Sequence, residues 1–264
     1  EGNLVTFPRG GSDITGAILA AALQADLYEN FTDVDSVYAV NPSIVDRPKE
    51  ISELTYKEMR ELSYAGFGVF HEEALAPAVR ARIPVCIKNT NNPQAPGTMI
   101  VAERKLKGEP VVGIASDKGF LNIYVEKYLM NREIGFGRKL LQILEEEGLS
   151  YEHTPSSIDS LNVILRANQL TAEKETRLIE RIETELHADK VTIERDIALI
   201  MIVGEAMNQT IGVAAKAVTA IQDANVNIAM INQGSSEVSM MFCVKETDAE
   251  KAVKSIYEAF FKGK

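Results

Sequence analysis

The sequence is poor in the residues that build disulfide scaffolds and metal centres. It has two cysteines and three histidines among 264 residues, and no metal-ligand spacing appears among them. Cys86 and Cys243 each lie inside an apolar run, where a small buried side chain is the expected role. We therefore expect neither a disulfide framework nor a metal site.

Long apolar runs and excess positive charge are also missing. No window approaches the roughly 18 to 20 apolar residues that span a bilayer, and the N-terminus has no secretory signal pattern. The chain has 28 Lys and Arg against 38 Asp and Glu, a net charge of −10, so its surface repels nucleic acid and anionic membranes. We expect a cytoplasmic protein that binds neither. Because residue 1 is Glu1 and a motif follows almost at once, the sequence reads as part of a longer polypeptide.

What is present is an ordinary globular composition, with 45% hydrophobic and 25% charged residues. At roughly 100–200 residues per domain, the length indicates two or three domains. Residues 1–108 alternate helix-like segments (12–25, 53–65, 72–82) with strand-like ones (27–31, 84–88), which predicts an α/β layer with largely parallel strands. The charged segment 103–110 is typical of a linker.

Beyond residue 120 the pattern nearly repeats. Strand, helix, strand, strand, helix and strand follow at 120–126, 134–147, 149–154, 160–165, 171–187 and 190–194. A second unit from 198 has strands at 198–203, 226–232 and 237–244 and helices at 211–224 and 248–261, so it is one strand short. Since an unpaired sheet edge is a liability, we predict that residues 111–115 supply this strand and that the first βαββαβ unit is inserted into the second.

One motif carries the chemistry of the first part, Arg9-Gly10-Gly11-Ser12-Asp13 at the start of a helix. The glycines allow close approach of the backbone, and the free N–H groups at the helix start attract an anion. Arg9 can grip a carboxylate, and Ser12 or Asp13 can cap the helix. A plain glycine turn explains the motif alone equally well.

Further motifs follow it in order. They are Phe31-Thr32-Asp33-Val34-Asp35-Ser36-Val37-Tyr38, Asn41-Pro42, Pro77-Ala78-Val79-Arg80, Ile83-Pro84-Val85, Asn89-Thr90-Asn91-Asn92-Pro93 and Gly97-Thr98. The series closely resembles the C-terminal half of the catalytic domain of aspartate kinase, in the amino acid kinase family. It covers nearly all of residues 1–108.

The resemblance implies phosphoryl transfer from MgATP to the side-chain carboxylate of L-aspartate, without a tightly bound cofactor. It implies that Arg9, Gly10, Gly11 and Ser12 bind the substrate and that Asp13 orients a catalytic lysine. It also implies a nucleotide site at Thr32, Asp33 and Tyr38, closed by a loop containing Lys88, Asn89 and Thr90. Such chemistry depends on positioning and charge neutralisation.

Two departures from the family pattern stand out. Gly68 occupies a place where relatives commonly carry a lysine, and Ser43 follows Asn41-Pro42 where many have arginine. The Lys-Phe-Gly-Gly segment, whose lysine neutralises the transferred phosphoryl group, does not occur within the 264 residues. We therefore predict negligible kinase turnover by this polypeptide alone.

The two βαββαβ units resemble ACT domains, which bind small effectors. In the first unit the resemblance implies an effector pocket formed by Met130, Gly135, Phe136, Gly137, Tyr151, Glu152, Ser156 and Ser157. An acidic residue there suits lysine, with threonine or both as alternatives. In the second unit a plain turn is favoured at 208–212. Its alternating strands fit sheet edges that pair between subunits, which predicts a homodimer or higher oligomer.

These inferences combine into one expected architecture. It is a partial amino acid kinase α/β sandwich (1–108) followed by two ferredoxin-like ACT modules (109–196 and 197–264), the first inserted in the second. The expected function is feedback-regulated aspartate kinase. A non-catalytic amino-acid sensor with a kinase remnant is the alternative, and a kinase acting on glutamate or a nucleotide is disfavoured by the tandem ACT units.

Overall fold

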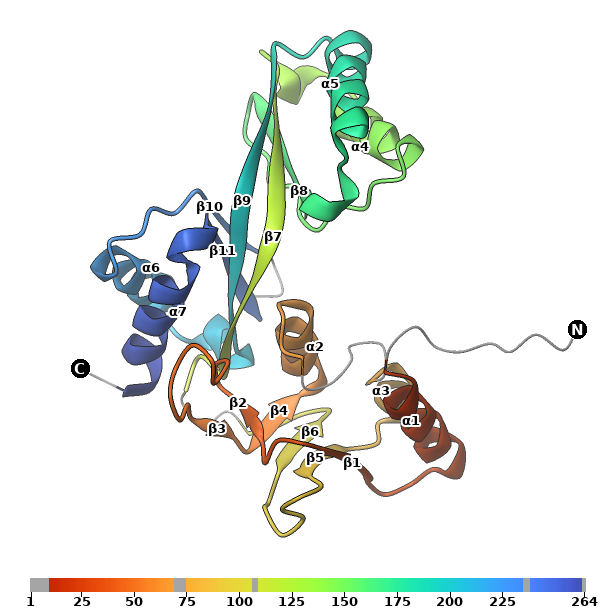
Figure 1. Ribbon diagram of the computed structural model, residues 1–264, viewed down its shortest axis with the longest axis vertical. Coiled ribbons are helices and arrows are strands. Elements are labelled where there is room, and N and C mark those ends of the chain that lie inside the picture. The colour runs from red at the N-terminus through yellow and green to blue at the C-terminus, as the bar shows by residue number, and fades with distance from the viewer. Residues whose placement is uncertain (1–9, 69–74, 106–108, 235–237, 263–264) are drawn as a thin grey trace, which may run out of the picture. The chain divides into compact units, whose positions relative to one another are not determined.

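The computed structural model describes residues 10–68, 75–105, 109–234 and 238–262. It divides into two compact units (Figure 1). The first unit is drawn from residues 1–117, 200–242 and 248–264, and the second from residues 118–199 and 243–247. Within the described ranges, no helix has the length and apolar character needed to cross a bilayer.

A four-stranded mixed sheet forms the centre of the N-terminal part. The elements are α1 (Gly11–Leu23), β1 (Tyr28–Thr32), β2 (Val37–Tyr38), β3 (Glu50–Ile51), β4 (Glu53–Thr55), α2 (Tyr56–Tyr64), α3 (Leu75–Ala81), β5 (Val85–Asn89) and β6 (Thr98–Val101). The sheet order is β1-β5-β6-β4, and β2 pairs separately with β3. The β1–β5 and β4–β6 pairs are parallel while β5–β6 is antiparallel, so the expected parallel character holds for two of three pairs.

Local sequence explains where these elements start. Thr55 and Glu58 form a capping box at the start of α2, each side chain bonding the other residue's backbone N–H. The predicted strand around Cys86 is β5, whose first three residues are buried. Both Cys86 and Cys243 are free, buried thiols, as the sequence predicted.

A five-stranded sheet organises the rest of the chain. The elements are β7 (Gly113–Glu126), η2 (Met130–Arg132), α4 (Phe136–Glu146), β8 (Ser160–Arg166), η3 (Ala167–Gln169), α5 (Ala172–Leu186), β9 (Lys190–Val203), η4 (Glu205–Gln209), α6 (Val213–Asp223), β10 (Met230–Gln233), β11 (Ser239–Lys245), η5 (Glu246–Asp248), α7 (Ala249–Tyr257) and η6 (Glu258–Lys262). The sheet order is β10-β11-β9-β7-β8.

β7 and β9 are antiparallel, as bonds near their two ends indicate. Val112 N–H donates to Val203 O at 2.7 Å, and Asp189 N–H donates to Glu126 O at 2.8 Å. On its other side β7 pairs antiparallel with β8, from Phe120 opposite Arg166 onward. The segment that follows the linker thus lies beside β9, which supports the proposed insertion of one ACT module in the other.

The expected breaks in two strands are wrong. The sequence predicted separate strands at 111–115 and 120–126, but one strand, β7, runs through Gly113–Glu126. The strands predicted at 190–194 and 198–203 are likewise one strand, β9. Two turn-forming residues within these strands, Gly119 (φ 85°) and Asp196 (φ 58°), adopt a left-handed backbone conformation, which is found in β-bulges. Turn residues can therefore bend a long strand without ending it.

Two further local predictions need correction. Residues 149–154 form no strand; they contribute the isolated bridge His153–Ile164. β6 (Thr98–Val101) was not expected, because its four residues are shorter than the runs that indicate a strand.

The second unit has its own hydrophobic core. Leu140, Ile143 and Leu144 of α4 and Leu178 and Ile182 of α5 are nearly inaccessible to solvent. Their spacing of three and four residues places them on one face of each helix. This core packs α4, which begins with the predicted effector residues Phe136 and Gly137, against β7 and β8.

Candidate functional site

The start of α1 has the open backbone that the glycine motif predicted. Gly10 is the N-cap and has a left-handed φ of 67°, which favours glycine. The suggestion that Ser12 or Asp13 caps the helix is wrong, because Gly10 is the N-cap and both residues lie inside the first turn. The first N–H groups of a helix have no partner within it, so this turn can receive an anion. Arg9, predicted to bind the substrate carboxylate, lies outside the described residues.

Asp13 is held by neighbours on β1. Its Oδ1 accepts a hydrogen bond from Asn30 Nδ2 at 3.0 Å, and its backbone carbonyl accepts one from the Tyr28 hydroxyl at 3.2 Å. Burial, with a smaller contribution from the Asp13 charge, raises the pKa of Tyr28 despite the opposing bond from Asn30, so the phenol stays a neutral donor. Ser12 is exposed. The Asp13 carboxylate, which also accepts a 3.5 Å hydrogen bond from the Ser12 hydroxyl, is therefore held in place.

A cavity of about 240 Å³ opens where β1 ends. Three of the predicted nucleotide residues, Thr32, Asp33 and Tyr38, line it. Its other walls are Val34, Val40, Asn41, Gly66, Phe67 and Gly68. Burial raises the pKa of the Tyr38 hydroxyl, with smaller effects from Glu50 and Asp35, so Tyr38 is a neutral hydrogen-bonding group here.

The remaining predicted nucleotide residues lie at the end of the neighbouring strand. Asn89 is the register partner of Thr32, and Thr90 N–H donates to Thr32 O at 2.8 Å. The Lys88 ammonium lies 3.5 Å from the Glu29 carboxylate and over the Phe31 ring. These three residues are beside the cavity but are not among its lining residues. The structure thus gathers part of the predicted set around one cavity and leaves the rest at its margin.

Sequence reasoning singled out Gly68 as a departure from the family pattern but missed Gly66 and Phe67, which form a wall of the cavity with it. These residues follow α2, and Gly66 has a left-handed φ of 108°. The available signal was the pattern Gly66-Phe67-Gly68 after a predicted helix. Gly68, where relatives commonly have lysine, is a cavity residue.

The predicted effector residues lie in the second unit around β8. Met130 and Phe136 are buried, and Gly135 caps α4 with a φ of 81°. A Cβ at Gly137 would lie 3.7 Å from the Leu161 side chain, and Ser156 forms a bridge with Leu161. The start of α4 and the segment beside β8 therefore meet at Leu161.

The other predicted effector residues are more dispersed. Ser157 N–H donates to Ser160 O at 2.8 Å, and Glu152 N–H donates to Ile164 O at 2.7 Å. Tyr151 instead lines a shallow groove with Arg138 and Gln169. Of the eight residues, Met130 and Phe136 belong to the hydrophobic core, and Tyr151 lines the groove.

Just before α4, one carboxylate is paired with two lysines. Glu133 accepts hydrogen bonds from Lys127 and Lys139, which lower the pKa of its carboxyl to about 2. Among the described residues, no group of three His, Cys, Asp or Glu side chains could hold a metal ion.

Comparisons with known proteins identify the family. The amino acid kinase family model matches residues 1–89, and the ACT domain model matches residues 200–260. Aspartokinase 3 of Bacillus subtilis (strain 168) is 65% identical over 263 residues, covering 100% of this chain and 58% of that protein. The chain belongs to the aspartokinase family.

Solved aspartokinase structures agree with this assignment. Clostridium acetobutylicum aspartate kinase has 47% identity and a TM-score of 0.91, covering 97% of this chain and 59% of that one. E. coli aspartokinase III, at 27% identity, has TM-scores of 0.81 in complex with aspartate and ADP and 0.78 with lysine and aspartate. Those two matches cover 96% and 97% of this chain and 56% and 57% of the E. coli chains. The chain thus spans less than two thirds of each aspartokinase described here. The predicted family and the fold class, a partial amino acid kinase part followed by ACT modules, are confirmed.

Proposed function

We propose that the chain is part of an aspartate kinase that transfers the γ-phosphoryl group of MgATP to L-aspartate, giving 4-phospho-L-aspartate for lysine, threonine and methionine synthesis. One observation carries this proposal. Asp13 at the start of α1 is bonded to Asn30 of β1, and the cavity begins at Thr32, two residues further along that strand. A candidate anion site and the cavity of about 240 Å³ therefore lie along one strand.

The chemistry suits these residues. The side-chain carboxylate of aspartate is ionised at neutral pH, so no general base is required. Positioning and charge neutralisation supply the catalysis in phosphoryl transfer. The backbone amides of Gly11 and Ser12, together with Arg9, would bind a carboxylate of aspartate. The nucleotide would be held by Thr32, Asp33 and Tyr38. Mg²⁺ would arrive with ATP.

A chimera tests the kinase function. The upstream part of Bacillus subtilis aspartokinase 3, which this chain does not cover, is joined to residues 1–264, and 4-phosphoaspartate is trapped with hydroxylamine. We expect aspartate-dependent hydroxamate from the chimera and negligible amounts from the chain alone. A folded chimera that binds aspartate or lysine yet forms no hydroxamate would support the non-catalytic sensor instead.

We also propose that the first ACT module, residues 109–196, binds an amino-acid effector and that the second, residues 197–264, completes the shared sheet. Lysine is the favoured effector, since E. coli aspartokinase III has been solved with lysine. The acidic Glu152 would face its ammonium group. Threonine, alone or with lysine, is the alternative.

A thermal-shift series on the chain with lysine, threonine, methionine, aspartate and ATP checks the effector. A true effector at 100 times its Kd stabilises the fold by about 2.7 kcal/mol. We expect this for lysine, with weaker shifts for ATP. Glu152→Gln should weaken lysine binding about tenfold or more, because a charge-assisted bond is lost. Glu183→Gln on the exposed surface of α5 is the control, and equal shifts for both variants would remove Glu152 from the site.

We propose in addition that the protein is a homodimer or higher oligomer through its ACT modules. β10 is at one edge of the five-stranded sheet, and Ile231 on it is 50% exposed. An open edge with an exposed apolar side chain is suited to pairing with another copy.

A further inference from the structure

Glu58, near the start of α2, carries a fully buried carboxylate with four hydrogen-bond donors. Arg104 approaches it with Nε at 2.8 Å and Nη2 at 2.6 Å. The backbone N–H groups of Thr55 and Glu205 each donate at 2.9 Å. A buried charge is tolerated only when it is paired and hydrogen-bonded in this way. All of these residues belong to the first unit.

The donors come from three segments that are distant in the sequence. Thr55 ends β4, Arg104 lies in the predicted linker after β6, and Glu205 opens η4 within the region that matches the ACT domain. One carboxylate therefore joins the kinase part, the linker and the ACT module. Burial alone would raise the pKa of Glu58, but Arg104 and the two amides outweigh it and hold the pKa below its ordinary value. Glu58 is consequently ionised throughout the neutral range.

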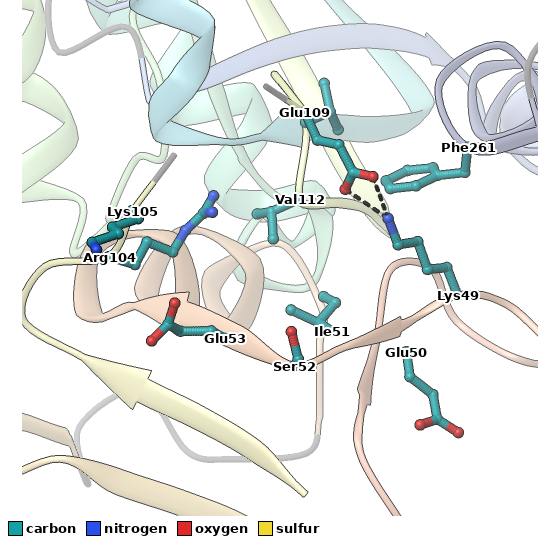
Figure 2. A pocket seen from close by; sticks show the side chains of 11 residues that line it. Lys49, Glu50, Ile51, Ser52, Glu53, Arg104, Lys105, Glu109, Val112 and Phe261 are labelled. Atoms are coloured by element: carbon teal, nitrogen blue, oxygen red, sulfur yellow. Dashed lines mark hydrogen bonds and ion pairs between the residues drawn. The ribbon is translucent and has the colours of Figure 1, made fainter. Parts of the chain in front are cut away.

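A second set of contacts holds the far end of the linker. Lys49 forms an ion pair with Glu109, its ammonium lies over the Phe261 ring, and its backbone N–H donates to the Tyr257 hydroxyl. Figure 2 shows Arg104 on one side of a cavity of about 210 Å³ and the Lys49–Glu109 pair on the other. The charges of Arg104, Lys49 and Glu109 are matched within the protein. This cavity therefore lies where the kinase part, the linker and the C-terminal helical segment meet.

α2 connects this junction to the nucleotide cavity. The helix runs from Tyr56 to Tyr64, and Phe67 N–H just beyond it donates back to Leu62 O at 3.0 Å. Gly66, Phe67 and Gly68 then form a wall of the cavity. A shift of the helix start is passed to this wall, because a helix is a stiff element.

We propose that Glu58 is a positioning residue for nucleotide binding: by tying the linker and the ACT module to α2, its carboxylate sets the 66–68 wall of the cavity. The residue touches no nucleotide. It links the arrangement of the ACT module to nucleotide affinity. This inference rests on the proposed kinase function, because the cavity must hold ATP.

The test compares Glu58→Gln with Glu61→Gln in the active chimera. Glutamine keeps the shape of Glu58 but removes the charge that binds Arg104, while Glu61, on the same helix, is outside the cluster. We expect the KM for ATP to rise about fivefold or more in Glu58→Gln, the size of a typical coupling between sites, with the KM for aspartate unchanged. Inhibition by the effector should weaken in parallel, and Glu61→Gln should match the wild type.

Two results would overturn the proposal. One is an unchanged KM for ATP in a folded Glu58→Gln enzyme, with or without a loss of kcat, and the other is an equal rise of the KM for ATP and the KM for aspartate. If Glu58→Gln does not fold, the same kinetics are measured on Arg104→Lys, which keeps the charge but loses the forked contact.

Hydrogen exchange on the chain itself supplies a readout that needs no activity. We expect faster exchange of the amides of Glu205 and of residues 66–68 in Glu58→Gln, and unchanged protection at residues 66–68 would contradict the connection through α2. An inactive wild-type chimera would refute the kinase function, whereas this exchange measurement would still decide the role of Glu58.

Discussion

Replacing Arg104 with methionine should lower the free energy of unfolding by about 3–5 kcal/mol at pH 7, the range for an ion left without its partner in a protein interior. The Glu58 side chain is fully buried and that of Arg104 is 11% exposed, so water cannot replace the lost guanidinium. Urea denaturation at pH 7 measures the change. The double variant Arg104→Met with Glu58→Met should lose less than Arg104→Met alone, because no unpaired charge remains.

An exposed ion pair supplies the control for this prediction. Arg82 and Glu103 are 3.7 Å apart with side chains 75% and 88% exposed, so Arg82→Met should cost less than about 1 kcal/mol. If Arg104→Met also lowers the free energy of unfolding by less than about 1 kcal/mol, water reaches the Glu58 carboxylate and the prediction is wrong.

The loss should also depend on pH. The folded-state pKa of Glu58 is lowered, so its ionised form stabilises the fold above the unfolded glutamate pKa of about 4.3, and this contribution disappears as the pH falls through the folded pKa. Glu205 and Glu53 are the acidic neighbours of Arg104 that act with Glu58. Without Arg104, burial is no longer opposed by the guanidinium, so Glu58 in Arg104→Met takes up a proton at a higher pH than in the wild type. The destabilisation of Arg104→Met should therefore shrink as the pH falls towards the lowered folded-state pKa of the wild-type Glu58.

Asp13→Ala in the chimera should reduce kcat about 100-fold, the effect of misplacing a reacting group by about 1 Å. The family resemblance implies that Asp13 orients the catalytic lysine, and the bond from Asn30 fixes its carboxylate. Steady-state hydroxamate assays give kcat. Asp26→Ala, at an exposed position after α1, should leave kcat unchanged.

Asp13→Asn separates charge from position. The asparagine can still accept the bond from Asn30 but carries no charge toward the lysine. If the charge of Asp13 matters, kcat should fall as much in Asp13→Asn as in Asp13→Ala. If only the bond to Asn30 matters, kcat should fall little. Full activity in both variants would remove Asp13 from the mechanism.

Local patterns were enough to predict where the helices lie, although their ends differ by a few residues from those in the structure. The nucleotide residues Thr32, Asp33 and Tyr38 were implied by the family resemblance, and they line one cavity because they are close along the chain. Glu58 could not be found this way. Its partners Arg104 and Glu205 are 46 and 147 residues away, and a glutamate three residues after Thr55 looks like an ordinary capping box.

The strand errors have a different cause. Gly119 and Asp196 are turn-forming residues, and only pairing with neighbouring strands keeps the chain extended through them. Pairing over long distances is not visible in a window of ten residues. The wall at residues 66–68 was missed for the same reason, because α2 must fold back before these residues meet β1.

The two long strands have a consequence for protein engineering. β7 and β9 each contribute to both compact units, so the expected module boundary at 196/197 falls inside β9. A recombinant piece starting at residue 197 would keep only the last part of β9 and would lose β7, leaving β9 with an open edge prone to aggregation. Exchanging the ACT modules between members of the family should accordingly succeed only when residues 109–264 are transferred as a single piece.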